Sequence, residues 1–399
     1  MPYDVAVVGL GAVGSSALYA LARQGVRVVG IDRFNPPHAF GSSHGETRIT
    51  RQAIGEGEAY VPLVLRSNAI LESIEAQTGE VLIERCGFLL IMREDENSSC
   101  HGKAGFLATT ISAARGFGIT HEVLGSVEVA QRFPQFTGLV GDEQAYYEPG
   151  GGLVRPERCV AALLQQARSA GAHIRTDSQV SAIVNINGDF RISSPSGDVI
   201  ANHVILATGA WVGQLAPKSV NPHIRIYRQA LHWFALLDSS AYRAGCTPTF
   251  YWGHGLTTAE QFYGFPPVNG QIKAGLEQYA TEWDPDDLSR DVAAQEGYVM
   301  AQKHVTGRLA GVARLPSHSK ACLYTATSDF DFLIDFESHP RYVVVSACSG
   351  HGFKHAPALG EAVAARVLGL KSSFDTGPFE GARFRNASSE APALNKLRG

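Results

Sequence analysis

The order of apolar and polar positions predicts a strand–helix–strand unit at the start of the chain. Residues 5–8 are apolar and mostly β-branched, with no polar alternation, which is typical of a strand buried on both faces. Apolar positions recur with helical spacing across residues 16–24, and Gly25 ends that pattern. Residues 26–31 form a second apolar run, which closes at Asp32.

The same patterns predict further elements along the chain. Short apolar runs predict strands at 87–91, 204–207 and 342–347. Helical spacing predicts helices at 60–76, 157–170, 289–306 and 356–368. Asn187-Gly188 indicates a hairpin that joins strands at 180–186 and 190–194. Two stretches are less regular, and they predict short strands in the aromatic-rich region 223–275 and an exposed polar turn at 95–102.

The first turn carries the glycine pattern of a dinucleotide-binding site. Gly9 allows a tight turn, Gly11 allows a pyrophosphate to approach the backbone, and Gly14 allows the helix to pack closely on the strand. The helix N-terminus offers unpaired N–H groups to phosphates. Asp32 ends the second strand, where a carboxylate can hold ribose hydroxyls and disfavours a 2′-phosphate. This order of elements predicts dinucleotide binding.

The later strand–turn–helix units favour FAD and a two-domain architecture. A strand that ends in Ala-Thr-Gly at 207–209, and the returning strand and helix at 342–368, are common in two-domain flavoproteins. We expect an α/β fold in which a Rossmann-like FAD-binding domain is assembled from three segments and a substrate domain is built on an antiparallel sheet. The expected FAD-binding segments are 1–85, 150–217 and 321–399, and the expected substrate segments are 86–149 and 218–320.

Charge and cysteine usage narrow the function classes. The chain has 399 residues and a net charge of −4, and its basic residues are scattered, so a nucleic-acid surface is not expected. It has no signal-peptide pattern and no apolar stretch of the roughly 20 residues that a membrane helix needs, so a cytoplasmic protein without a membrane partner is expected. The cysteines, Cys86, Cys100, Cys159, Cys246, Cys322 and Cys348, lack metal spacing, so we expect no metal and, for at least four of them, reduced and mostly buried thiols, with Cys322 as the exception.

Long strings spread over nearly the whole chain are similar to one known family. They cover Pro36-Pro37-His38, Gly41-Ser42-Ser43-His44-Gly45-Glu46-Thr47-Arg48-Ile49-Thr50-Arg51, and residues 55–63, 209–211, 263–266, 322–325, 332–335, 349–354, 374–375 and 378–379. On these strings the chain resembles the monomeric sarcosine oxidase and N-methyltryptophan oxidase family. The resemblance implies a monomeric enzyme that oxidises the C–N bond of a secondary amino acid, N-methyl or cyclic, to an imine while O2 becomes H2O2.

The resemblance also implies how the cofactor is held. It implies that FAD is bound covalently through Cys322, the cysteine of the Cys-x-Tyr-Thr string. The final turn would aim a helix N-terminus at the flavin. Besides the glycines and Asp32, the implied cofactor contacts are Ser42, Ser43, Thr47, Val180, Gly209, Trp211, Gly350, Gly352, Phe353 and Lys354.

Reactive and substrate-binding roles are implied in the same way. Arg51 and Lys354 would clamp the substrate carboxylate, which suits a guanidinium because it can grip a carboxylate with two N–H groups. Lys273 would lie over the flavin face and assist the reaction with O2, where a fixed cation stabilises developing negative charge. His44 and Arg48 would lie beside the isoalloxazine ring as further catalytic residues.

The chain departs from the family pattern in its substrate pocket, of which Tyr263 would form one wall. The sarcosine and methyltryptophan branches carry a histidine four residues after the lysine, whereas this chain has Glu277. A carboxylate there can bind a hydroxylated or cationic part of a larger substrate, as in related fructosyl amino acid oxidases. A deglycating oxidase is therefore an alternative to the oxidase of a secondary amino acid. An FAD-dependent amine dehydrogenase that does not use O2 is a second alternative, against which Lys273 argues.

Overall fold

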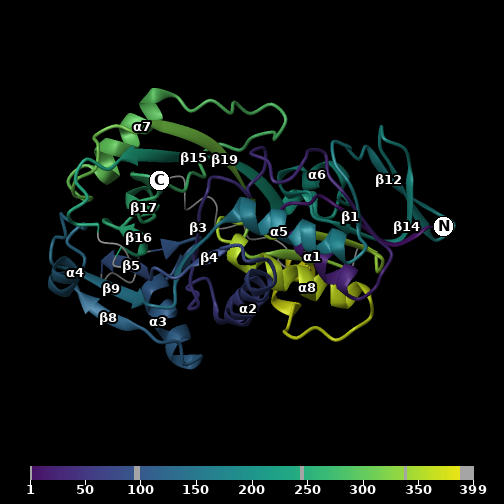
Figure 1. Ribbon diagram of the computed structural model, residues 1–399, viewed down its shortest axis with the longest axis horizontal. Coiled ribbons are helices and arrows are strands. Elements are labelled where there is room, and N and C mark those ends of the chain that lie inside the picture. Colours follow the sequence, from purple (N-terminus) through teal and green to yellow (C-terminus); the bar gives the residue numbers. More distant parts are fainter. Residues whose placement is uncertain (1, 94–98, 243–246, 337–338, 387–399) are drawn as a thin grey trace.

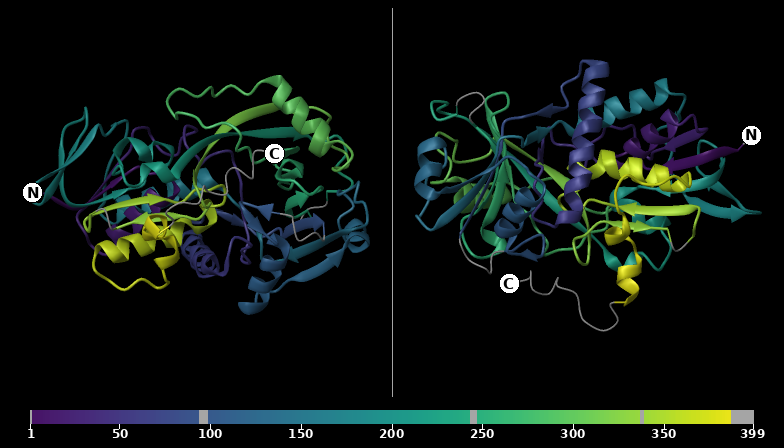
Figure 2. Two further views of the ribbon diagram at one scale, coloured as in Figure 1. Left: turned by 180° about the vertical axis from the view of Figure 1, so that it is seen from behind. Right: turned by 90° about the horizontal axis from the view of Figure 1, so that it is seen from below.

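The fold is described by a computed structural model, which covers residues 2–93, 99–242, 247–336 and 339–386. Cys246 and residues 95–98, which entered the sequence predictions, lie outside the described residues. The chain forms two large sheets, which lie at opposite ends of its long axis (Figures 1 and 2).

The first sheet has eight strands from three separated stretches of the chain. They are β1 (Tyr3–Val8), β2 (Val28–Ile31), β11 (His173–Arg175), β12 (Ala182–Ile186), β13 (Asp189–Ser193), β14 (Val199–Leu206), β20 (Leu333–Asp335) and β21 (Tyr342–Ser346). The neighbours in the order β11-β2-β1-β14-β21 are parallel, while β12, β13 and β20 pair antiparallel. Parallel strands around a central first strand are typical of a dinucleotide-binding fold, as expected.

Both faces of the inner parallel strands β1, β2 and β21 are buried, which explains their unbroken apolar pattern. Val5 and Val7 belong to the core beneath the helices, whereas Ala6 and Val8 belong to a second core on the opposite face. The helices beside the sheet are α1 (Ala12–Arg23), α2 (Val61–Thr78), α5 (Pro156–Ser169) and α8 (Ala356–Val367). Helix α1 contacts α5 and α8, and Figure 1 shows these three helices side by side.

The second sheet also has eight strands, in the order β19-β15-β18-β17-β16-β5-β9-β8. Their bounds are β5 (Phe88–Arg93), β8 (Glu122–Gly125), β9 (Glu143–Glu148), β15 (Ile224–Ala235), β16 (Thr249–Gly253), β17 (Gln261–Gly264), β18 (Gln271–Gly275) and β19 (His318–Thr327). Every neighbouring pair is antiparallel except β5 and β16, which are parallel. The predicted antiparallel sheet is therefore present, with one parallel pair inside it.

The chain also forms two small sheets and several short helices. The small sheets are one of β3 (Arg48–Thr50), β10 (Gly152–Val154) and β4 (Ile83–Glu84), and a hairpin of β6 (Ser99–Cys100) and β7 (Lys103–Ala104). The other α-helices are α3 (Phe106–Gly116), α4 (Ser126–Arg132), α6 (Val212–Leu215), α7 (Ala294–Met300) and α9 (Ala382–Asn386), and a π-helical turn spans Ala301–Val305. Short 3-10 turns are η1 (Glu58–Tyr60), η2 (Gly209–Trp211), η3 (Asn221–His223), η4 (Thr258–Glu260), η6 (Phe353–His355) and η7 (Gly377–Phe379).

Three details of the sequence prediction differ from the structure. The helix predicted at 289–306 begins at Ala294, and the region 223–275 contains the twelve-residue strand β15 rather than only short strands. The turn predicted to be exposed at 95–102 is wrong at its described end, because Cys100 and His101 are buried. The division into two domains stays a prediction; its boundary at residue 321 falls inside β19.

The five cysteines that the structure describes form no disulfide. Cys100, Cys159 and Cys322 are buried, and Cys86 and Cys348 are partly exposed. Among the residues that the structure describes, no helix combines the length and apolarity needed to cross a membrane.

Candidate functional site

A long cavity starts at the carboxyl ends of the parallel strands. Val8, Ile31, Ala207 and Ala347 line it at or just after the ends of β1, β2, β14 and β21. It continues to the second sheet, where Tyr263 on β17 forms part of its wall. The cavity holds about 1940 Å³ of empty space when its opening to solvent is counted. The edge of a parallel sheet beyond its carboxyl ends is where such folds bind their ligands.

The glycine turn is built as the fingerprint requires. Gly9 has a φ of 89°, and a Cβ on it would lie 2.5 Å from the carbonyl oxygen of Ala207. A Cβ on Gly14 would lie 1.7 Å from the carbonyl oxygen of Gly9, so any side chain there would push α1 off the strand. Asp32 is buried, and its carboxylate accepts the backbone N–H of Leu10 at 2.6 Å. Burial raises the pKa of Asp32 against the effect of such backbone donors.

Observations at the same end of the cavity fit FAD. The first turn of α1 carries no acidic residue, and its N-cap Gly11 gives no side-chain cap, so its positive dipole end and its N–H groups beyond that of Ala12 face the cavity as a phosphate site. The Ser43 hydroxyl accepts the N–H of Ala12 at 3.2 Å. Three hydroxyls of the lining residues Thr208, Thr325 and Ser346 are buried without a hydrogen-bond partner among the described residues. Unpaired buried hydroxyls are rare, and they indicate a polar ligand in this cavity.

In the middle of the cavity, Arg48 contacts the chain at three places. Its guanidinium donates to the carbonyl oxygens of Thr47 and Ser42, each at 2.8 Å, and lies 3.4 Å from the Cys322 sulfur. Cys322 lies on β19 and is buried. Burial raises the pKa of the Cys322 thiol, although Arg48 opposes this effect. The arrangement places a cysteine directly behind two cavity-lining residues, Ser42 and Arg48.

Two further basic groups lie next to this cluster. The Lys273 ammonium on β18 donates to the carbonyl oxygens of Gly45 at 2.7 Å and Thr47 at 2.6 Å, and it lies 4.0 Å from the ring centre of Phe265. Burial and the nearby Arg48 lower the pKa of Lys273 well below its usual range. Burial, together with Arg48, lowers the pKa of His44 to about 3. His44 is therefore a neutral imidazole, and both of its ring nitrogens lack a hydrogen-bond partner within the described part of the chain.

The far end of the cavity holds two buried cations. Arg51 donates to the carbonyl oxygen of Ala53 at 2.8 Å and to Glu56 at 2.6 Å. Lys354 donates to the carbonyl oxygen of His351 at 2.8 Å. Burial opposes ionisation of Glu56, but Arg51 and His351 hold the pKa of that carboxyl well below its usual range. Burial lowers the pKa of Lys354 to about 8, against the effect of Glu56.

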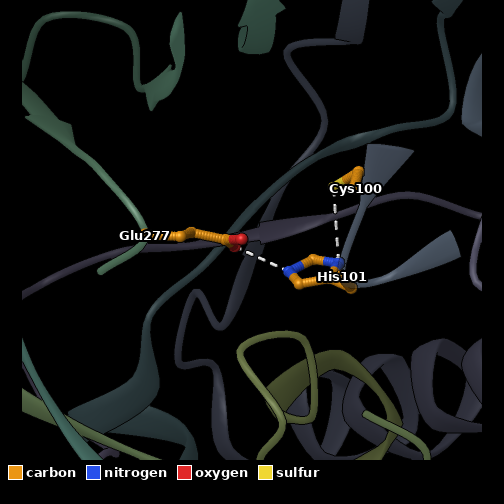
Figure 3. Close-up of side chains that lie close together, drawn as sticks. All are labelled: Cys100, His101 and Glu277. Atoms are coloured by element: carbon orange, nitrogen blue, oxygen red, sulfur yellow. Dashed lines mark hydrogen bonds and ion pairs between the residues drawn. The ribbon is translucent and has the colours of Figure 1, made fainter. Parts of the chain in front are cut away.

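Glu277 reaches the same end of the cavity from the segment after β18. One of its oxygens accepts the Nε2–H of His101 at 2.6 Å (Figure 3), and the other accepts the Tyr279 hydroxyl at 3.1 Å. His101 and Glu56 were both missed by the sequence analysis as site residues. Glu56 lies inside one of the family-like strings, which is a signal that was available, whereas His101 lies in a polar stretch without a motif.

The structure brings most of the predicted site residues to this cavity. Those that line it are Gly9, Gly11, Asp32, Ser42, Ser43, Arg48, Arg51, Val180, Gly209, Trp211, Tyr263, Glu277, Gly350, Gly352, Phe353 and Lys354. The others lie behind the lining or inside the glycine turn, and they are Gly14, His44, Thr47, Lys273 and Cys322.

Comparisons with known proteins agree with this architecture. The model of the DAO family, described as FAD dependent oxidoreductase, matches residues 4–366. The monomeric sarcosine oxidase of Streptomyces avermitilis is 33% identical over 392 residues, which are 96% of this chain and 98% of that protein. The N-methyl-L-tryptophan oxidase of Yersinia pestis is 35% identical over 398 residues, which are 96% of this chain and 100% of that protein.

Solved structures show the same fold. NikD, an unusual amino acid oxidase essential for nikkomycin biosynthesis, has a TM-score of 0.80 at 22% identity over 95% of this chain and 97% of that chain. The glycine oxidase of Geobacillus kaustophilus has a TM-score of 0.75 at 20% identity over 95% and 98% of the two chains. Taken with the glycine turn, the buried acid and the family match over most of its length, these findings show that the chain is an FAD dependent oxidoreductase of the DAO family.

Proposed function

We propose that this chain oxidises the C–N bond of a secondary amino acid, N-methyl or cyclic, to an imine and reduces O2 to H2O2. The observation that carries the proposal is the pair of buried cations, Arg51 and Lys354, at the end of the cavity away from the glycine turn. The names of the two similar oxidases support the same substrate class. When bound, FAD would supply the redox chemistry, accepting a hydride equivalent and passing electrons to O2.

The two cations suit the carboxylate of an amino acid. A guanidinium has five N–H groups, and Ala53 and Glu56 use two of those of Arg51 among the described residues. The remaining N–H groups and the Lys354 ammonium can bind a carboxylate inside the cavity, where water screens the charges weakly. A carboxylate fixed at this end positions the amine toward the middle of the cavity, and such positioning supplies much of the catalysis.

The Lys354 pKa makes carboxylate binding depend on pH. Because that pKa lies at about 8, the cation is present below it and is lost as the pH rises through it. Methoxyacetate has no amine, and its carboxylate stays ionised across this range, so only protein groups titrate. We expect its affinity, measured from the flavin absorbance change, to fall roughly tenfold between about pH 7 and about pH 10. The Lys354→Met variant should bind methoxyacetate more weakly, and its affinity should not fall over this pH range. If the variant kept the pH dependence of the wild type, Lys354 would not be the group that titrates.

We further propose that FAD is attached covalently through the Cys322 sulfur. The thiol is buried beside Arg48, and a cation 3.4 Å from the sulfur favours the thiolate that must form the bond. The new S–C bond would replace the S–H bond of Cys322 and a C–H bond of the flavin 8α-methyl group, and the two electrons released would pass through the flavin to O2. The wild-type protein should stay yellow after acid precipitation, whereas Cys322→Ser should release its flavin into the supernatant. Cys159→Ser, which changes another buried thiol, is the matched control and should retain the colour. Flavin that stays bound to precipitated Cys322→Ser would contradict this attachment.

The substrate class is tested by peroxide release. Purified enzyme is assayed with sarcosine, N-methyltryptophan, pipecolate and a fructosyl amino acid, and Glu277→His is assayed beside it. We expect peroxide from at least one N-methyl or cyclic amino acid. Turnover of the fructosyl substrate alone would replace the proposal with a deglycating oxidase. Reduction of the flavin without peroxide in air would replace it with a dehydrogenase.

A further inference from the structure

His101 lies between two carboxylates at the substrate end of the cavity. Its Nε2 donates to Glu277 at 2.6 Å, and its Nδ1 forms an ion pair with Glu56 at 3.1 Å. All three residues line the cavity, where the side chains of His101 and Glu56 are almost fully buried and that of Glu277 is 11% exposed. The imidazole therefore connects the carboxylate that holds Arg51 with the carboxylate that faces the ligand space.

The surroundings of His101 favour its charged form. The titratable groups that face it are Cys100, Glu56, Glu277 and the His351 ring, whose centre is 5.1 Å away. Burial alone would lower the pKa of His101, but the Cys100 sulfur and the Glu277 carboxylate hold it well above its usual range. A protonated imidazole is a donor at both nitrogens, as the two carboxylates require.

A metal ion does not suit this cluster. The ligand atoms of Cys100, His101 and Glu277 lie within 4.8 Å of one another. However, Cys100 approaches Nδ1 at 3.5 Å and Glu277 contacts Nε2, so the two lie at opposite nitrogens of the ring (Figure 3). One ion can coordinate only one ring nitrogen, and the three groups do not converge on one point. The contacts are those of an imidazole that bridges two carboxylates, by a hydrogen bond to Glu277 and an ion pair with Glu56.

The fold makes room for this bridge. Gly350, on the turn after β21, has a φ of 81°, and a Cβ there would lie 3.1 Å from His101 Nε2 and 3.2 Å from the Tyr279 hydroxyl. A side chain at this position would press on the hydrogen bonds to both oxygens of Glu277. The carboxylate is therefore fixed from two sides, while its remaining lone pairs face the cavity.

We propose that His101 is a positioning residue, which holds Glu277 as the acceptor for the N–H of the substrate amine. This inference rests on the proposed oxidation of an amino acid. With the substrate carboxylate on Arg51 and Lys354, the next donor of the ligand is its amine. Two carboxylates line the cavity at that end, and Glu277 is the more exposed of them, because Glu56 is 1% exposed and pairs with Arg51. The imidazolium offsets part of the Glu277 charge. The carboxylate can therefore accept the N–H of the substrate amine without strongly favouring the protonated amine. This matters because the amine must lose its extra proton before it is oxidised.

A double-mutant cycle tests this inference. His101→Gln, Glu277→Gln and the double variant are compared for kcat and KM with the best amine substrate, and for the Kd of methoxyacetate, which keeps the carboxylate but has no N–H. We expect each single variant to lower kcat/KM for the amine by roughly tenfold to a hundredfold. The double variant should be no worse than Glu277→Gln, because His101 acts through Glu277. The Kd of methoxyacetate should change less than about threefold.

Control variants separate this role from a structural one. His304→Gln removes another buried histidine, bonded to His254 at 3.0 Å, and should leave kcat/KM unchanged. If His101→Gln does not bind FAD, His101→Asn and Tyr279→Phe take its place, since Tyr279 holds the other Glu277 oxygen. The inference would be overturned if the kcat/KM losses of His101→Gln and Glu277→Gln multiplied in the double variant. It would also be overturned if the variants lost affinity for methoxyacetate as much as they lose kcat/KM for the amine. If the wild-type enzyme oxidises no amine, the oxidase proposal fails, but the role of His101 can still be tested. The Kd of sarcosine is then compared among the same variants in place of kcat/KM.

Discussion

Replacing Arg51 by glutamine is expected to lower kcat/KM for the amino acid substrate by about a thousandfold, equivalent to about 4 kcal/mol. The substrate carboxylate would lose its charge-assisted contacts, and Glu56 would lose the partner 2.6 Å away that offsets its buried charge. The Arg51 side chain also packs against the rings of Phe88 and Phe106, with ring centres 5.5 Å and 5.2 Å away. Steady-state kinetics, with the Kd of methoxyacetate, measure the effect.

A matched control separates this effect from a general loss of stability. Arg85 forms an ion pair with Glu72 at 2.6 Å at the surface, outside the cavity lining, and Arg85→Gln should leave kcat/KM unchanged. Flavin content and thermal stability are compared for both variants. An Arg51→Gln enzyme that binds FAD and retains kcat/KM within tenfold of wild type would exclude Arg51 from the carboxylate site.

Lys273→Met is expected to slow the reaction of the reduced enzyme with O2 by about a hundredfold to a thousandfold. The ammonium is held by the carbonyl oxygens of Gly45 and Thr47, which leaves one of its three N–H groups unused among the residues described. Burial lowers the pKa of Lys273, but in its protonated form the side chain is a fixed cation that stabilises the negative charge developing as O2 takes up electrons. Stopped-flow mixing of reduced enzyme with oxygenated buffer measures this step alone.

Reduction of the flavin by substrate without air should change much less in Lys273→Met than the O2 step. Lys320→Met provides the control, because Lys320 is an exposed lysine whose ammonium lies 5.6 Å from the Trp233 ring centre, and it should leave both steps unchanged. Equal losses in both steps for Lys273→Met would show that Lys273 shapes the site rather than assisting O2.

The sequence was sufficient where a feature depends on neighbouring residues. The turn from Gly9 to Gly14 and the acid at Asp32 follow from spacing within one strand–helix–strand unit, and the structure has each of them in place. The alternation of Val5 and Val7 toward one core and Ala6 toward another likewise follows from a strand buried on both faces.

The sequence was insufficient where a side chain is stabilised by distant partners. His101 lies in a polar stretch that predicts an exposed turn, yet it is buried because Glu56 and Glu277 neutralise its charge. Those partners lie 45 and 176 positions away along the chain, and no local pattern indicates them. The ion pair of Arg51 with Glu56 and the two carbonyl acceptors of Lys273 are tertiary contacts of the same kind.

The most direct test of the central proposal is the colour of the flavin during one turnover. Purified enzyme is mixed without air with sarcosine, N-methyltryptophan or pipecolate, and its visible absorbance is followed before and after air is admitted. We expect at least one of these amino acids to bleach the flavin, and air to restore the colour while peroxide forms. A flavin that none of them bleaches, or that stays bleached in air, would contradict an oxidase of secondary amino acids.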